Sequence, residues 1–382
     1  MRELTGYRDA DGRVGIRKHV LILSLMSFCN RATELIAQSV RGTLPLVHPH
    51  GSMEIGVYRE RLDRCLQGVA LNPDVHSVLV VGYESKATAS FVEGLRKLSR
   101  KPIDSVLLPE GGTSKAVWLG TEKAIQLVTA ASETHRQRIT MQDLVVGVKC
   151  GGSDATSGIA SNAAVGVAVD RIIESGGTVI FSETTEILGA EHILARRAKN
   201  DSVAQKITRA VQENEQMAMA AGIDLMGINP VPDNIRGGIS TIEEKSLGAI
   251  LKTGTSPVED VLGYAEAPCR PGLYFMDSPS AATEVMTALA AAGAQLILFS
   301  TGVGNPAGNL IAPVLKITSN PRSVARVSEH IDVDISDVLG GTMSIPEAGE
   351  RVLDMIAASV NGRVTKSEVI GHLEFAPVAI GL

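Results

Sequence analysis

Short apolar runs alternate with longer amphipathic stretches along the chain. Each run is rich in Val, Ile and Leu and ends in a polar or Gly-bearing turn, as is typical of buried parallel strands. The predicted strands are 19–24, 77–81, 105–108, 144–148, 178–182, 273–276 and 295–300. The predicted helices are 31–38, 90–98, 114–133, 162–175, 187–200, 202–221 and 281–292. The alternation predicts an α/β fold of parallel, Rossmann-like sheets with helices on both faces.

A polar stretch at 130–142 interrupts this pattern and precedes a strong strand, so we expect a boundary there. It divides an N-terminal α/β subdomain, 1–135, from a C-terminal α/β catalytic subdomain, 136–382. The segment 227–257 is rich in Gly, Pro, Asn and Thr and has weak periodicity. A long irregular segment inside a compact domain is more often functional than accidental.

Composition excludes several classes of partner. Only 3% of the 382 residues are aromatic, too few for a surface that stacks single-stranded nucleic acid. The formal charge of −6 argues against a binder of phosphate backbones, so we expect no nucleic acid partner. With 38 glycines and few rings, the core must consist of Val, Ile, Leu and Ala, with many tight turns.

The ends and the cysteines indicate a cytoplasmic protein. The first residues carry no apolar signal segment, and no apolar run approaches the roughly 20 residues that span a bilayer. We therefore expect no membrane association. The four cysteines are widely spread without a CxxC pair, which is typical of reduced thiols.

Ligands of open α/β sheets bind outside the carboxyl ends of strands, so chemistry is expected in the turns that follow them. The first such turn is 149–154, where Cys150 ends a strand and Ser153 and Asp154 follow two glycines. Asp154 suits acid/base work. The alternative is a buried cysteine that only packs, with Ser153 or Asp154 capping the next helix. The residues alone leave both open.

The second turn, 182–186, is followed by a histidine. Glu183, Glu186 and His192 combine carboxylates with an imidazole, which suits metal ligation or general acid/base catalysis. The alternative is a helix start capped by a threonine, with acidic residues favoured by the helix dipole. That alternative explains Glu186 well, but Glu183 and His192 less well.

Two further segments offer donors for an acidic ligand. In 229–238, Asn234 and Gly238 lie in a proline-stiffened stretch, for which a plain loop is the alternative. In 300–309, glycines surround Thr301, but the GxxxxGK[ST] pattern of phosphate loops is absent. A carboxylate-binding nest is the better interpretation, with Lys316 returning to the same site.

Candidate residues also occur near the N-terminus. His50 belongs to a His-Pro-His stretch, which is a candidate base if it is not simply a surface loop. Arg13 and Arg17 lie four residues apart before a strand and either bind an acidic substrate or are solvated.

Several motifs together resemble those of the altronate/galactarate dehydratase family, over nearly the whole chain. They are Gly6-Tyr7, 11–17, Cys150-Gly-Gly-Ser-Asp154, Ser182-Glu-Thr-Thr-Glu-Ile-Leu-Gly-Ala-Glu-His192, Asn234, Gly237-Gly238, Glu244-Lys-Ser-Leu-Gly248, Phe275-Met-Asp-Ser-Pro279 and Thr301-Gly-Val-Gly304.

This resemblance implies a metal-dependent lyase, usually with Fe²⁺, although Mn²⁺ or Mg²⁺ is also expected to suit. Such an enzyme acts on a sugar acid or a related 2-hydroxy carboxylate. It removes the proton next to the carboxylate and expels the β-hydroxyl as water, leaving a 2-keto acid. The family also includes the large subunit of sulfolactate sulfo-lyase, which expels sulfite. The chain is similar to such a large subunit, so the resemblance implies a separate small subunit. We also expect an oligomer.

On this basis we expect catalytic roles for His50, Asp154, Glu183 and His192, and metal ligation by Cys150 and Glu186. The predicted substrate ligands are Arg13, Arg17, Ser153, Asn234, Gly238, Thr301 and Lys316.

Two departures from the family pattern concern the metal. The family has a cysteine after its His-Gly stretch and another in Gly-Cys-Glu, whereas this chain has Ser52-Met53-Glu54 and Tyr83 there. If those cysteines bind iron, this chain has lost soft ligands and is expected to use a harder metal through oxygen. A paralogue that binds a hydroxy acid without catalysis is the alternative to an enzyme.

Overall fold

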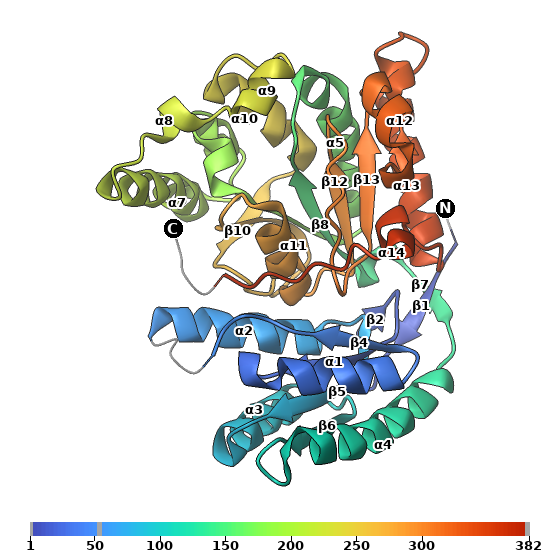
Figure 1. The fold of residues 1–382 in the computed structure, drawn as a ribbon. Coiled ribbons are helices and arrows are strands. Elements are labelled where there is room, and N and C mark those ends of the chain that lie inside the picture. Colours follow the sequence, from blue (N-terminus) through green and yellow to red (C-terminus); the bar gives the residue numbers. More distant parts are fainter. Residues whose placement is uncertain (1–2, 52–55, 379–382) are drawn as a thin grey trace.

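The computed structural model describes residues 3–51 and 56–378, and its two main sheets are parallel and covered by helices (Figure 1). The predicted α/β class is therefore confirmed. None of the described helices is both long enough and apolar enough to cross a membrane.

The first sheet has four parallel strands in the order β4-β3-β5-β6. The strands are β3 (His19–Ser24), β4 (Thr43–Leu46), β5 (Val75–Gly82) and β6 (Ile103–Leu107). The helices are α1 (Asn30–Ser39), α2 (Val57–Leu71), α3 (Ser85–Leu98) and α4 (Gly112–Ser132). Strand β3 is a continuous apolar run because its two faces pack against different helices. Leu21 belongs to the core shared with α2, and Ile22 to the core shared with α1 and α4.

The second sheet has seven parallel strands in the order β10-β11-β9-β8-β12-β13-β14. They are β8 (Val145–Cys150), β9 (Thr178–Phe181), β10 (Val258–Leu262), β11 (Gly272–Met276), β12 (Leu296–Ser300), β13 (Val314–Thr318) and β14 (Val333–Asp334). Its helices are α5 (Asn162–Glu174), α6 (Glu191–Arg196), α7 (Asp201–Ala220), α8 (Leu225–Ile228), α9 (Pro232–Arg236), α10 (Ile242–Ile250), α11 (Ala282–Ala291), α12 (Pro321–Val327), α13 (Ile345–Val360) and α14 (Lys366–Ile370).

The two domains touch at several places among the described residues, of which the following are examples. A small antiparallel sheet pairs β1 (Leu4–Arg8) with β2 (Val14–Gly15) and with β7 (Gln137–Ile139), joining segments from both sides of the predicted boundary. Helices α2 and α11 pack so closely that a Cβ on Gly68 would overlap the carbonyl of Ala291. The C-terminal tail runs between the domains (Figure 1), where the backbone N–H of Val378 donates to the Tyr264 hydroxyl at 3.1 Å. The boundary at 135/136 stays a prediction.

Every predicted strand corresponds to an observed one, but the expectation of an irregular segment at 227–257 is wrong. That segment includes the end of α8 and all of α9 and α10, which are too short to show a helical period. Helix α10 has a capped start, because the Thr241 hydroxyl accepts from the Glu244 N–H at 3.2 Å. The predicted helix 187–200 is shorter than expected, because Gly189 adopts φ 85° and α6 begins only at Glu191.

Candidate active site

A buried cluster of charges lies at the carboxyl ends of β8 and β9. The Glu183 carboxylate is 2.7 Å from Lys149 Nζ and 3.0 Å from Lys252 Nζ, and these three side chains are at most 2% exposed. The backbone N–H of Cys150 donates to the same carboxylate at 3.0 Å. One carboxylate therefore neutralises only one of two buried ammonium groups. With Cys150 as a thiol, the cluster retains a net positive charge.

Sheet register explains how Lys149 reaches this position. Phe299 of β12 pairs with Lys149 of β8 on one side and with Lys316 of β13 on the other. Residues paired in this way share one face of the sheet. The two ammonium groups accordingly lie 5.2 and 5.3 Å from the centre of the Phe299 ring. The register thus produces a Lys-Phe-Lys row across three strands.

The backbone of Glu183 is strained. Its φ of 81° is left-handed, which a residue with a side chain adopts at a cost of about 1–3 kcal/mol. Such residues persist where their surroundings hold them, and here two ion pairs and the Cys150 N–H hold the carboxylate. Strain of this kind concentrates at functional sites.

Burial and neighbouring charges shift the pKa values of several groups in this cluster. Burial opposes ionisation of Glu183, but Lys149 and Lys252 outweigh it and hold the pKa of Glu183 below its usual range. Burial raises the pKa of the Cys150 thiol, whose Sγ accepts from Lys252 Nζ at 3.2 Å. Burial also lowers the pKa of Lys316 to about 8. Lys316 therefore has a neutral fraction available to accept a proton near neutral pH.

Asp154 forms a second centre at the same edge of the sheet. Its carboxylate accepts from the Thr156 hydroxyl at 2.6 Å, the Ser157 N–H at 3.0 Å and the Asn320 side chain at 2.7 Å. A Cβ on Gly302 would overlap this carboxylate, so the turn at residue 302 can lie this close to Asp154 only with glycine.

The structure places several predicted substrate ligands around Asp154. The Asn234 side-chain amide donates to the Ser153 carbonyl at 2.9 Å. A Cβ at Gly238 would lie 3.4 Å from Ala155 Cβ. Thr301 precedes the Gly302 turn, and its hydroxyl accepts from the Gly304 and Asn305 N–H groups, both at 3.1 Å.

A cavity of about 210 Å³ opens beside Asp154. Its lining includes Ser153, Asp154, Asn162, Glu244 and Lys245. One wall is a π-helical turn at Ser157–Ser161, a distortion that is frequent at functional sites. Lys245 Nζ in turn lies 2.9 Å from the Glu186 carboxylate and donates to Asn229 at 2.8 Å.

The remaining predicted residues lie elsewhere. His192 is exposed at the start of α6, and no hydrogen bond or ion pair of its side chain occurs within the described part of the chain. His50 belongs to the first domain, and its Nε2 lies 3.1 Å from the Pro377 carbonyl. Their catalytic roles stay predictions.

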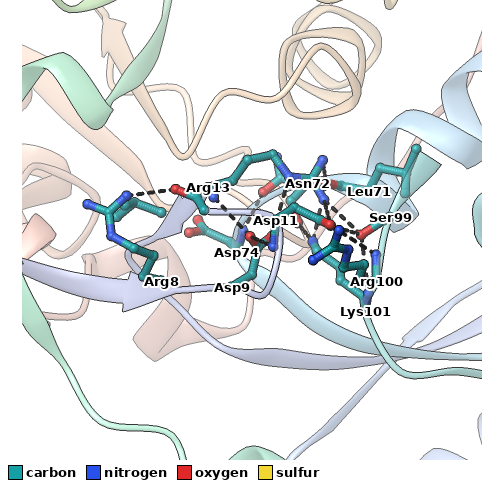
Figure 2. A network of polar contacts seen from close by, with 12 residues as sticks. Arg8, Asp9, Asp11, Arg13, Leu71, Asn72, Asp74, Ser99, Arg100 and Lys101 are labelled. Atoms are coloured by element: carbon teal, nitrogen blue, oxygen red, sulfur yellow. Dashed lines mark hydrogen bonds and ion pairs between the residues drawn. The ribbon is translucent and has the colours of Figure 1, made fainter.

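Arg13 and Arg17 lie at the amino ends of the strands of the first domain. Figure 2 shows Arg13 in a network with Asp9, Asp11 and Ser99, and its Nη2 lies 2.9 Å from the Ser99 hydroxyl. Arg17 forms an ion pair with Glu368 at 2.8 Å. Both side chains thus have structural partners away from the strand-end cluster, and their role in substrate binding stays a prediction.

The structure pairs each predicted metal ligand with a lysine, and the metal-binding role of both residues stays a prediction. Within residues 3–51 and 56–378, no group of three or more His, Cys, Asp or Glu side chains is placed to hold an ion. Cys150 contacts the Lys252 ammonium group and Glu186 contacts that of Lys245, and positive neighbours repel a cation. Glu54 lies outside the described residues. We therefore derive no step through a metal.

Sequence reasoning missed Lys149, Lys252 and Lys245 as site residues. Lys149 had a detectable signal, because a charged residue inside an apolar strand must find a partner when both faces are covered. Lys252 gave none, since its partner Glu183 is remote in sequence and only the fold brings them together.

Comparisons with known proteins identify the family of this chain. The profile for the C-terminal part of D-galactarate/altronate dehydratase matches residues 141–382, and that for the second domain of D-galactarate dehydratase/altronate hydrolase matches residues 6–132. The chain therefore belongs to the D-galactarate/altronate dehydratase family of lyases.

Individual relatives fall into two groups. The chain is 42% identical to the beta subunit of (2R)-sulfolactate sulfo-lyase from Chromohalobacter salexigens, over 98% of this chain and 96% of that one. It is 31% identical to altronate dehydratase of Escherichia coli, over 96% of this chain but 76% of the relative. Galactarate dehydratase (L-threo-forming) of the same organism is 28% identical, over 94% and 72%.

Proposed function

We propose that this chain is the large, catalytic subunit of a lyase that eliminates a β-leaving group from a small 2-hydroxy carboxylate. The observation that carries the proposal is the buried Lys149–Glu183–Lys252 cluster at the carboxyl ends of parallel strands. The proton next to a carboxylate is very weakly acidic, so elimination requires positive charge near the forming enolate. A buried cluster with net positive charge supplies it.

The Lys-Phe-Lys row on the sheet face suggests which residue is the base that removes the α-proton. Lys316 lies beside Phe299 opposite Lys149, and burial lowers the pKa of Lys316 to about 8. An amine with a pKa near the operating pH is suited to take the α-proton. In this proposal Lys149 and Lys252 stay charged on Glu183 and stabilise the enolate, while Lys316 moves the proton.

The leaving group is water or sulfite. Loss of the 2-proton and a β-hydroxyl gives an enol, which becomes a 2-keto acid. Loss of the 2-proton and the sulfonate of sulfolactate gives enolpyruvate, hence pyruvate, and hydrogen sulfite. Hydroxide needs an acid to leave, whereas sulfite leaves more readily. The 42% identity over nearly the full length of both chains favours sulfite, and elimination of water from a sugar acid is the second candidate.

The same comparison supports a separate small subunit. This chain covers 96% of a relative that is named as a beta subunit, but only 76% and 72% of the two E. coli dehydratases. A dependence on Fe²⁺, or on Mn²⁺ or Mg²⁺, remains a prediction from the family resemblance.

The test is to assay the purified chain, with and without its small partner, on (2R)-sulfolactate, altronate and galactarate, measuring keto acid and sulfite together. We expect pyruvate and sulfite in equal amounts from sulfolactate. Lys149→Met should abolish turnover, whereas Lys97→Met, on an exposed ion pair with Glu93, should not. Full activity of Lys149→Met would refute the role of the cluster, and a keto acid formed only from the sugar acids would establish water as the leaving group.

A further inference from the structure

One cavity at the interface between the domains has no part in the mechanism above. It has a volume of about 210 Å³. Its lining comes from α2, α7, the turns after β10 and β11, and the C-terminal tail. It includes Tyr58, Arg61, Asn214, Tyr264, Asp277 and Ser278. Cavities that hold drug-sized ligands measure roughly 300–1,000 Å³, so this one suits a smaller, polar molecule.

Arg61 is the cation of this cavity. Within residues 3–51 and 56–378, its guanidinium makes no hydrogen bond or ion pair. Its neighbours on the same helix differ: Arg59 pairs with Asp63 at 2.9 Å, and Arg64 donates to the Tyr264 carbonyl at 3.3 Å. Burial raises the pKa of Asp277 in the same cavity, and the charge of Arg61 opposes that rise. A half-buried guanidinium with five donors and no hydrogen-bond acceptor among the described residues is suited to a carboxylate or sulfonate group.

The floor of the cavity is built on both neighbours of Glu183. Asp277 accepts from the Thr184 hydroxyl at 2.6 Å, and Thr184 follows Glu183 in the chain. Ser278 makes a hydroxyl contact with Ser182, which precedes Glu183. The floor of the cavity is therefore hydrogen-bonded to the segment that carries Glu183.

The other polar groups suit a hydroxylated acid. Asp277 is an acceptor for a substrate hydroxyl, and Asn214 on α7 adds donors and an acceptor. Tyr58 and Arg61 come from the first domain, whereas Asp277 and Asn214 come from the second. The cavity is complete only when the two domains are together.

We propose that Arg61 binds a second acidic group of the substrate, a sulfonate or a carboxylate, while the reacting carboxylate lies toward the Glu183 cluster. This inference rests on the proposed function. It makes Arg61 a specificity residue that favours dianionic acids over monoanionic ones.

The first test measures binding without turnover, by calorimetry on the full chain. The probes are 3-sulfopropionate, succinate and propionate, which lack the 2-hydroxyl. We expect the wild type to bind at least one dianion about 10- to 100-fold more tightly than propionate. Arg61→Met should remove that difference, Arg61→Lys should restore part of it, and the matched control Arg59→Met should retain it. Arg61→Met and wild type with equal dianion affinity would overturn the inference.

The same variants in the turnover assay separate this inference from the proposed function. If wild type eliminates sulfite and Arg61→Met raises KM about 10- to 100-fold with a smaller change in kcat, the result supports both the proposed function and the role of Arg61. If turnover occurs and the KM of Arg61→Met is unchanged, the inference fails and the function stands. If no acid is turned over but dianions still bind through Arg61, the binding role of Arg61 is supported and the proposed function is refuted. The tighter of the two dianions shows whether sulfonate or carboxylate is the natural group.

Discussion

Replacing Glu183 with Gln tests the charge cluster most directly. The substitution keeps the shape of the side chain but removes the negative charge that lies 2.7 and 3.0 Å from two ammonium groups. At an effective dielectric constant of about 20, each such contact provides about 5–6 kcal/mol of attraction. Desolvation of the ions offsets much of this, and breaking a buried pair by removing one partner costs about 3–5 kcal/mol overall.

We therefore expect Glu183→Gln to lower the free energy of unfolding by about 3–5 kcal/mol near neutral pH, because two buried ammonium groups would lose their counterion. The deficit should shrink at pH 10, where the stranded lysines can lose their protons. The measurement is urea unfolding of wild type and variant at both pH values.

The matched control is Glu174→Gln, in an exposed ion pair with Arg171 at 2.8 Å, which should behave like wild type. If Glu183→Gln unfolded at the same urea concentration as this control, the lysines could not both be charged in the folded protein. The account of enolate stabilisation would then fail with it.

Three further predictions concern other parts of the molecule. Gly302→Ala should reduce activity at least tenfold and lower stability by about 1–3 kcal/mol, because its Cβ would displace the Asp154 carboxylate; kinetics and urea unfolding on one sample check both. Burial lowers the pKa of Lys101 in the folded protein to about 7. Between pH 10.5 and 7 the Lys101 amine is therefore protonated mainly in the unfolded chain, so the free energy of unfolding should fall as the pH drops through this window. Lys101→Met should flatten that dependence in thermal unfolding, and an unchanged slope would refute it. Cys150→Ser should keep the metal content of wild type in elemental analysis, since its sulfur contacts an ammonium group, and loss of metal would show that the thiol is a ligand.

The strands of the two sheet centres could be predicted because each consists of β-branched and aliphatic residues that need cover on both faces. The strand His19–Ser24 has the predicted bounds, and the others shift by one or two residues. Edge and connecting strands were missed, because Val14–Gly15 and Gln137–Ile139 are too short to show a period of two. The helix Val57–Leu71 was also missed, since its arginines and glycine weaken the apolar stripe.

The candidate site was predictable only in part. Placing chemistry at the ends of strands is a rule of parallel sheets, and it led to Cys150, Asp154 and Glu183. The partners of these residues were not predictable, because Lys252 and Asn320 lie far away in the chain and their segments carry no signal of their own. For Arg13 and Arg17, residue type suggested substrate binding, but it gave no sign of the ion pairs that the fold forms with Asp9, Asp11 and Glu368.

The sequence by itself determined the α/β class, the family and the turns where chemistry is expected, because these depend on local periodicity and contiguous motifs. The tertiary structure alone decided which charges meet. Parallel register set Lys149 and Lys316 on either side of Phe299, and chain folding brought Lys252 to Glu183. Contact between the domains placed Arg61 and Asp277 in one cavity. Pairing of buried charges depends on distances of a few ångströms between remote segments, and only the packed chain fixes these.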